Sequence, residues 1–182
     1  QSMKKKLVQT ASALAMSAAF LLSPVAHGAG ESPADFKLNQ LAGPPVSLSD
    51  HLGTDVIVLA FWATWCSPCK AEMPHLQSMH ERYADKGLRI MGINTDEARN
   101  QSKVRSEVKT RGLTYTILMD SETEVLSQLN PNMNLPFTVV IGRDGKVHSV
   151  HSGYTPGDEV ELEKELRALL GLADSPAAEA NP

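Results

Sequence analysis

Residues 56–61 read VIVLAF and form a continuous apolar run rich in β-branched side chains. A run of this length and composition predicts a buried strand rather than a helix. Three more segments have the apolar composition of strands: residues 88–93, 115–119 and 138–141. We expect these segments to form the sheet of the fold.

Shorter extended pieces lie on either side of this set. Residues 36–38 and 46–48 are separated by the sequence AGPP, which predicts a hairpin or a loose β-extension ahead of the main strand. Residues 138–141 and 146–150 flank the turn sequence GRDG, which predicts a β-hairpin near the C-terminus.

Apolar residues at helical spacing predict helices between the strands. Residues 76–83 carry such side chains, and Gly87 supplies a stop. A polar helix is expected over residues 97–111, ended by Gly112.

Two further helices are indicated by their starts. Ser121 and Glu124 have the spacing of a capping box, which predicts a short helix running to about residue 129. The sequence TPGD predicts the start of a last helix, with Pro156 at the first helical position and leucines in one stripe from residue 162 to 170. Strands that alternate with helices in this order predict an α/β fold with a mixed central sheet.

The first 28 residues have a different character. Gln1 and Ser2 precede Met3, and we interpret them as a remnant of an expression vector. From Met3, three lysines precede an apolar run over residues 7–22, followed by small residues. This three-part pattern predicts that residues 3–28 are a secretory signal peptide, cut before Ala29. An uncut membrane anchor is the alternative, although the run is shorter than the ~20 residues of a spanning helix. The leader contains no cysteine that could carry a lipid.

The remaining chain has the composition of one soluble domain, which we expect over residues 29–172. The full sequence of 182 residues is 42% apolar and 21% charged, and its length is sufficient to bury a core. Residues 173–182 are small, polar and proline-bearing, and we expect a disordered tail. Without the three leader lysines the formal charge falls from −4 to −7, so nucleic acid is not an expected partner.

Both cysteines of the chain, Cys66 and Cys69, follow the first buried strand at the expected start of a helix. The positive end of a helix stabilises a thiolate, so we expect Cys66 to be the exposed, attacking thiol with a lowered pKa. Cys69 lies one turn further in and is expected to be shielded.

Two cysteines at this spacing fit three kinds of site: a redox pair, half of a metal site, or a structural disulfide. At about 100° per residue, His75 and His80 point roughly 140° apart, so one tetrahedral zinc site cannot use both. A disulfide that closes so small a loop constrains the unfolded chain little. The pattern favours a redox pair, and we expect no metal and no cofactor beyond the cysteine pair itself. Because an oxidising compartment would close the pair, a dedicated electron donor is implied.

The sequence FWATWCSPCK at residues 61–70 resembles the thioredoxin superfamily signature, a buried strand followed by FWA, any residue, WC, any residue, and PC. Glu72 and the Met73 and Pro74 pair are similar to the TlpA-like and ResA-like thiol-disulfide oxidoreductases. The resemblance covers residues 36–170 in element order. It implies a thioredoxin fold: a mixed central sheet flanked by helices, with an N-terminal β-extension and a helix-strand insertion before a cis-proline.

The resemblance also implies a dithiol/disulfide cycle. Cys66 attacks a client disulfide, and Cys69 then resolves the mixed disulfide. Thioredoxin has a buried aspartate six residues before the first cysteine, but this chain has Ala60 there. The ResA-like branch instead has a glutamate at the position of Glu72, one helical turn from Cys69. We expect Glu72 to relay the proton and tune the thiol pKa values; the alternative is a solvated helix carboxylate.

Pro136 stands where the superfamily has a cis-proline that faces the cysteines. This position implies that the backbone of Leu135 pairs with an extended client strand. Leu135 replaces the threonine or valine common at this place. Trp65, Ser67 and Pro68 frame Cys66, and Trp65 is expected to offer an exposed apolar surface to the client.

The other histidines and the methionines carry no expected site. His148 and His151 are three apart in a predicted strand and are expected to face opposite sides. Met73, Met79, Met91 and Met119 are expected to be core fillers and not a copper-binding cluster. Trp62 is likewise expected in the core.

We expect an exported or periplasmic reductant, which a membrane thiol donor of the DsbD/CcdA type reduces and which then reduces client-protein disulfides. The resemblance suggests apocytochrome c and copper-site assembly proteins as clients. Alternatives are an exported oxidant or isomerase, and a copper(I) metallochaperone that uses the same cysteine pair. Peroxiredoxins share the fold, but their usual proline and threonine arrangement before the reactive cysteine is not matched at residues 60–66. Contact with the membrane is expected only if the leader is uncut.

Overall fold

The computed structural model describes residues 30–172. The expected vector remnant, signal peptide and C-terminal tail therefore lie outside the described residues. Within them, no helix combines the length and apolar composition needed to cross a membrane.

A seven-stranded sheet with the order β2-β1-β5-β4-β3-β6-β7 forms the centre of the molecule. Strands β3, β4 and β5 run parallel, while the other neighbours pair antiparallel. The strands are β1 Lys37–Gln40, β2 Val46–Ser47, β3 Val56–Trp62, β4 Leu88–Asn94, β5 Thr116–Met119, β6 Phe137–Ile141 and β7 Val147–Ser152. The predicted mixed sheet, its N-terminal β-extension and its C-terminal hairpin are confirmed.

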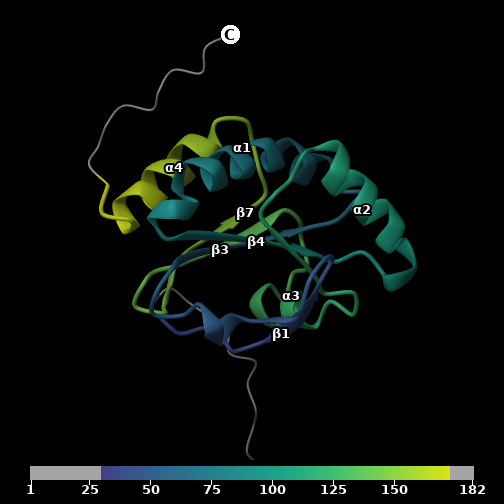
Figure 1. The fold of residues 1–182 in the computed structure, drawn as a ribbon, viewed down its shortest axis with the longest axis horizontal. Helices are drawn as coiled ribbons and strands as arrows, with labels where there is room; N and C mark the ends of the chain where they lie inside the picture. The colour runs from purple at the N-terminus through teal and green to yellow at the C-terminus, as the bar shows by residue number, and fades with distance from the viewer. Residues whose placement is uncertain (1–29, 173–182) are drawn as a thin grey trace, which may run out of the picture.

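Helices cover both faces of this sheet (Figure 1). The α-helices are α1 Ser67–Tyr83, α2 Gln101–Thr110, α3 Glu124–Leu129 and α4 Asp158–Leu169. Short 3-10 turns occupy Leu48–Asp50, Ala84–Lys86 and Ala98–Asn100. α1, α2 and α4 lie on one face, and α3 lies on the other (Figure 1). The strand β5 and the helix α3 precede Pro136, as expected for the helix-strand insertion.

Strand β3 is buried along its whole length because it lies between these two layers. Its alternate residues belong to two separate cores. Val58, Ala60 and Trp62 belong to the core beneath α1, whereas Leu59 and Phe61 belong to the core on the α3 side. Burial on both faces explains why the sequence shows a continuous apolar run and no alternation.

The expected capping box at the start of α3 is wrong. The helix begins at Glu124, and its N-cap residue Thr123 has φ of 57° and makes no side-chain cap. The carboxylate of Asp120 accepts hydrogen bonds from the backbone amides of Val125 (3.3 Å) and Leu126 (2.9 Å) instead. A buried carboxylate just ahead of the helix thus replaces the serine that the spacing suggested.

The expected start of α4 at Pro156 is also wrong. The chain passes through Gly157 with φ of 110°, so helical geometry begins only at Asp158. The carboxylate of Asp158 accepts a hydrogen bond from the amide of Thr155 at 2.7 Å, which fixes the turn ahead of the helix.

His148 and His151 do not face opposite sides as expected. The ladder between β6 and β7 is irregular: Val140 pairs with Ser149 but Ile141 pairs with Val147, so His148 is an extra residue. A β-bulge of this kind resets the alternation of side chains. As a result, both imidazoles lie near the carboxylate of Glu165, at 3.7 Å and 3.0 Å.

The observed cap of α3 predicts a contrast between two neighbouring residues. Asp120→Ala removes the acceptor of two buried amides, so we expect the free energy of unfolding to fall by about 2 kcal/mol. Ser121→Ala is the matched control and should change stability by less than about 0.5 kcal/mol. Urea unfolding of the oxidised protein measures both. A larger loss of unfolding free energy in Ser121→Ala than in Asp120→Ala would show that Ser121, and not Asp120, caps α3.

Candidate active site

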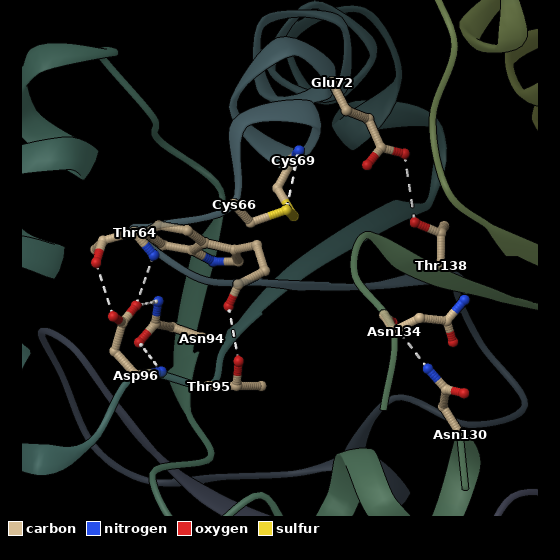
Figure 2. Close-up of a disulfide and its surroundings, with 11 residues drawn as sticks. Thr64, Cys66, Cys69, Glu72, Asn94, Thr95, Asp96, Asn130, Asn134 and Thr138 are labelled. Atoms are coloured by element: carbon tan, nitrogen blue, oxygen red, sulfur yellow. Dashed lines mark hydrogen bonds between the residues drawn. A yellow bond between two sulfur atoms is a disulfide. The ribbon is translucent and has the colours of Figure 1, made fainter. Parts of the chain in front are cut away.

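Cys66 and Cys69 form a disulfide at the point where β3 and its following turn lead into α1, with Cα atoms 5.3 Å apart (Figure 2). Cys66 is the N-cap residue of α1, and its Sγ accepts a hydrogen bond from the amide of Cys69 at 3.3 Å. The amide end of the helix is thus directed at this sulfur. That arrangement stabilises a thiolate on Cys66 once the disulfide is reduced.

The exposed position expected for Cys66 is wrong for this disulfide form. Cys66 is 4% exposed and Cys69 is 1% exposed. The sulfur of Cys66 is covered because it is bonded to Cys69 and turned toward the first turn of α1. The surface beside it is open, however, since Trp65 is 70% exposed and both Ser67 and Pro68 are exposed.

A buried carboxylate holds the turn ahead of Cys66. Asp96 accepts hydrogen bonds from the amide and the hydroxyl of Thr64, both at 2.7 Å, and from the side-chain amide of Asn94 at 2.9 Å (Figure 2). These contacts join the carboxyl end of β4 to the residue two positions before Cys66. Asp96 is not among the site residues predicted from the sequence. The available signal was its place just after a buried strand that runs beside β3.

Glu72 lies on the inner face of α1 and is only 8% exposed. Its Oε1 accepts a hydrogen bond from the hydroxyl of Thr138 at 3.4 Å (Figure 2). Burial raises the pKa of Glu72 to about 7, and the Thr138 hydrogen bond offsets only part of that rise. Glu72 is therefore not the solvated helix carboxylate that was the alternative interpretation.

The strand pairing relates Glu72 to the position where thioredoxin has its aspartate. Ala60 on β3 pairs with Thr138 on β6, so both side chains lie on the same face of the sheet. Thr138 is the residue that contacts Glu72. The Glu72 carboxyl group on α1 therefore contacts the sheet at Thr138, next to the small side chain of Ala60.

The loop before β6 carries the expected cis bond between Leu135 and Pro136. Pro136 is buried, and its carbonyl accepts a hydrogen bond from the amide of Gly153 at 2.8 Å. Leu135 is partly buried and packs against the core that contains both cysteines. Two asparagines brace this loop: Asn130 donates to the carbonyl of Asn134 at 2.9 Å (Figure 2), and Asn134 donates to Ser152.

The remaining candidates behave as packing or surface residues. Trp62 and the four methionines are buried in the cores, as expected. His75 lies 4.0 Å from the carboxylate of Glu159, whereas His80 packs edge-on against Tyr115. Across residues 30–172, no group of three or more His, Cys, Asp or Glu side chains is placed to hold a metal ion.

Comparison with known proteins gives consistent results. Residues 29–150 match the model of the AhpC/TSA family. The chain is 35% identical over 138 residues to the thioredoxin-like protein YneN of Bacillus subtilis, covering 75% of this chain and 79% of that protein. It is 32% identical over 146 residues to the thiol-disulfide oxidoreductase ResA of Geobacillus kaustophilus, covering 80% and 82%.

Solved structures resemble the whole fold. A Chlorobium tepidum protein assigned as thiol:disulfide interchange protein DsbE superposes with a TM-score of 0.73 at 30% identity, covering 80% of this chain and 99% of that one. A secreted Mycobacterium tuberculosis disulfide oxidoreductase homologous to Escherichia coli DsbE gives 0.64 at 25% identity, covering 73% and 95%. These likenesses confirm the expected thioredoxin fold.

The buried carboxyl predicts a pH-dependent stability. The pKa of Glu72 is raised from 4.5 to about 7 in the folded chain, so the folded state holds this proton more tightly than the unfolded state. The stabilisation is complete below the unfolded value and is lost as the pH rises through about 7. At pH above about 8 we expect Glu72→Gln to be more stable than wild type by about 2 kcal/mol.

Urea unfolding of the oxidised protein across this pH range measures the effect. The control is Glu122→Gln, which changes an exposed carboxyl and should follow the wild-type curve. Parallel curves for wild type and Glu72→Gln would contradict the burial of an ionisable carboxyl.

Proposed function

The chain belongs to the AhpC/TSA family and, within it, to the ResA-like thiol-disulfide oxidoreductases, and from that premise we propose that it is an exported reductant of client-protein disulfides. One observation carries the proposal: Cys66 caps α1 and is bonded to Cys69 in its first turn, while the next turn of the same helix presents the buried carboxyl of Glu72. That arrangement combines a stabilised thiolate with a nearby group that can accept a proton.

The first step uses Cys66. In the reduced protein its thiolate attacks one sulfur of the client disulfide, forming a mixed disulfide and releasing the other client sulfur as a thiolate. The amide of Cys69, which donates to Sγ of Cys66 at the N-terminal end of α1, favours the ionised form of Cys66. The exposed side chain of Trp65 and the backbone of Leu135 beside the cis bond offer the client an apolar contact and an extended pairing edge.

The second step uses Cys69 and Glu72. The Cys69 thiol gives its proton to the Glu72 carboxylate, and the resulting thiolate attacks Sγ of Cys66 and frees the second client thiolate. Two electrons pass to the client, and the Cys66–Cys69 disulfide forms. With a pKa of about 7, Glu72 is partly ionised near neutral pH and can both accept and return a proton.

Export and partners complete the proposal. The leader pattern of residues 3–28 and the secreted relative from Mycobacterium tuberculosis support a periplasmic or other exported location. A membrane thiol donor of the DsbD/CcdA type would restore the dithiol, because an oxidising compartment otherwise leaves the pair closed. Apocytochrome c before haem attachment and copper-site assembly proteins are the proposed client classes.

The reduction potential tests the direction of electron flow. We expect the Cys66–Cys69 pair to have a potential near the thioredoxin value of about −270 mV. The measurement equilibrates the protein with a thiol-disulfide buffer and traps the free thiols. A value near about −120 mV would contradict the reductant and would indicate an oxidant or isomerase.

Thiol titration tests the role of Glu72. A nearby carboxylate disfavours a second negative charge, so Glu72→Gln should lower the apparent thiol pKa values by about one unit. Alkylation rates of the reduced protein measured against pH report these values, with Glu122→Gln as the exposed control. If Glu72→Gln leaves the titration of Cys66 and Cys69 unchanged, Glu72 is not the proton relay.

A further inference from the structure

His151 and Glu72 approach the same region from different elements. His151 on β7 pairs with Thr138 on β6, and directly paired residues point to the same face of the sheet. The Thr138 hydroxyl contacts Glu72, so that face is the one beneath α1 (Figure 2). Helix α4, which packs beside α1, carries Glu165 to the same face (Figure 1).

A cavity of about 240 Å³ joins the two residues. Both Glu72 and His151 line it, together with Tyr154, Asp158 and Glu159. Glu72 is 8% exposed, while the His151 side chain is 40% exposed, so the cavity leads from a buried carboxyl to an imidazole that reaches solvent. Its size and polar lining suit a short chain of water molecules.

The imidazole of His151 is held firmly at this place. Its Nε2 lies 3.0 Å from the carboxylate of Glu165 and 3.1 Å from the hydroxyl of Ser149. The hydrogen bond with Glu165 raises the pKa of His151 despite the opposing effect of burial. Burial alone would raise the pKa of Glu165, but hydrogen bonds from His151 and Ser149 outweigh it and the pKa is lowered.

We propose that His151 is a positioning residue that acts through Glu72. It exchanges the Glu72 proton with solvent across the cavity, and it favours the ionised Glu72 carboxylate between turnovers. This inference rests on the proton-relay role proposed for Glu72. No existing contact needs to break, because Nε2 keeps its bond to Glu165 while the cavity supplies the path.

The proton balance is complete within the proposed reaction. The proton that Cys69 gives to Glu72 passes through the cavity to His151 and then to solvent. The client thiolate that leaves Cys66 takes up a proton from solvent. No further oxidant or reductant is needed, since the electrons move only between the two cysteine pairs.

Other charges also face His151 and must be separated from Glu72 in any test. Asp158 and Glu165 on α4 favour the protonated form of His151, as does Glu72 on α1.

Three further residues lie around this site. His148 on the same strand as His151 lies 3.7 Å from Glu165 but does not line the cavity. His75 on α1 contacts Glu159 and Tyr154 at the cavity wall. Glu161 on α4 completes the acidic lining.

If Glu72 and His151 are coupled through the cavity, a change at Glu72 shifts the titration midpoint of His151. Nuclear magnetic resonance of the imidazole protons measures this midpoint. In the oxidised full chain, Glu72→Gln should lower the titration midpoint of His151 by roughly half a pH unit, less than the shift of about 1–3 units for a directly contacting ion pair. The midpoint of His51, which contacts Asp55 and does not line the cavity, should stay unchanged in the same spectra and serves as the internal control.

The reaction itself gives the second readout. The rate of the reduced protein on a disulfide-bonded peptide is measured as a function of pH. In His151→Gln the midpoint of the rising limb of this pH–rate profile should lie roughly half a pH unit higher than in wild type, because Glu72 then ionises at higher pH. Glu165→Gln, which keeps the imidazole but removes its anchor, should shift the limb in the same direction. His148→Gln is the matched control and should behave as wild type.

The outcomes separate this inference from the proposed function. A normal profile in His151→Gln, with a shifted profile in Glu72→Gln, overturns the role of His151 and leaves the relay role of Glu72 intact. Equal shifts in His151→Gln and His148→Gln also overturn it, since they indicate a general surface-charge effect. A profile unchanged by Glu72→Gln overturns both proposals.

Discussion

The burial of one carboxyl group, that of Glu72, is the constraint on which the chemistry of this structure depends. A solvated carboxyl would be ionised at neutral pH and would seldom return a proton. A carboxyl isolated in an apolar core would stay protonated and could not accept one. The Thr138 hydroxyl and the charge of His151 offset part of the effect of burial and leave the pKa of Glu72 at about 7. The carboxyl is thereby suited to exchange a proton with the cysteine pair on the same helix.

The sheet supplies the setting for that carboxyl. Ala60, Thr138 and His151 pair in sequence across β3, β6 and β7, so they form one row under α1 and α4. The row changes from a small apolar side chain to a hydroxyl and then to an imidazole, passing from the core toward solvent. Glu72 meets this row at Thr138. A thioredoxin fold with alanine in place of the buried aspartate thus brings its carboxyl from the helix instead of from the strand.

The elements of this fold are predictable from the sequence where the signal is local. The strands and helices were located to within a few residues, because their apolar spacing lies within each segment. The prediction was wrong where the interacting residue is not the one that the local spacing suggests, or where the backbone departs from regular geometry. Asp120 caps α3 in place of Ser121, Gly157 delays α4 past Pro156, and a bulge at His148 changes which side chains share a face. None of these features alters the apolar pattern from which the prediction was made.

The sequence by itself determined the element order, the buried central strand and the position of Cys66 and Cys69 at a helix start, because each depends on residues within one or two turns of the chain. The tertiary structure alone decided that Asp96 holds the turn before Cys66, since its partner Thr64 is 32 residues away. It also decided that Glu72 is buried against Thr138, 66 residues away. Desolvation and hydrogen bonding between such distant groups set the pKa values, and no local pattern encodes them.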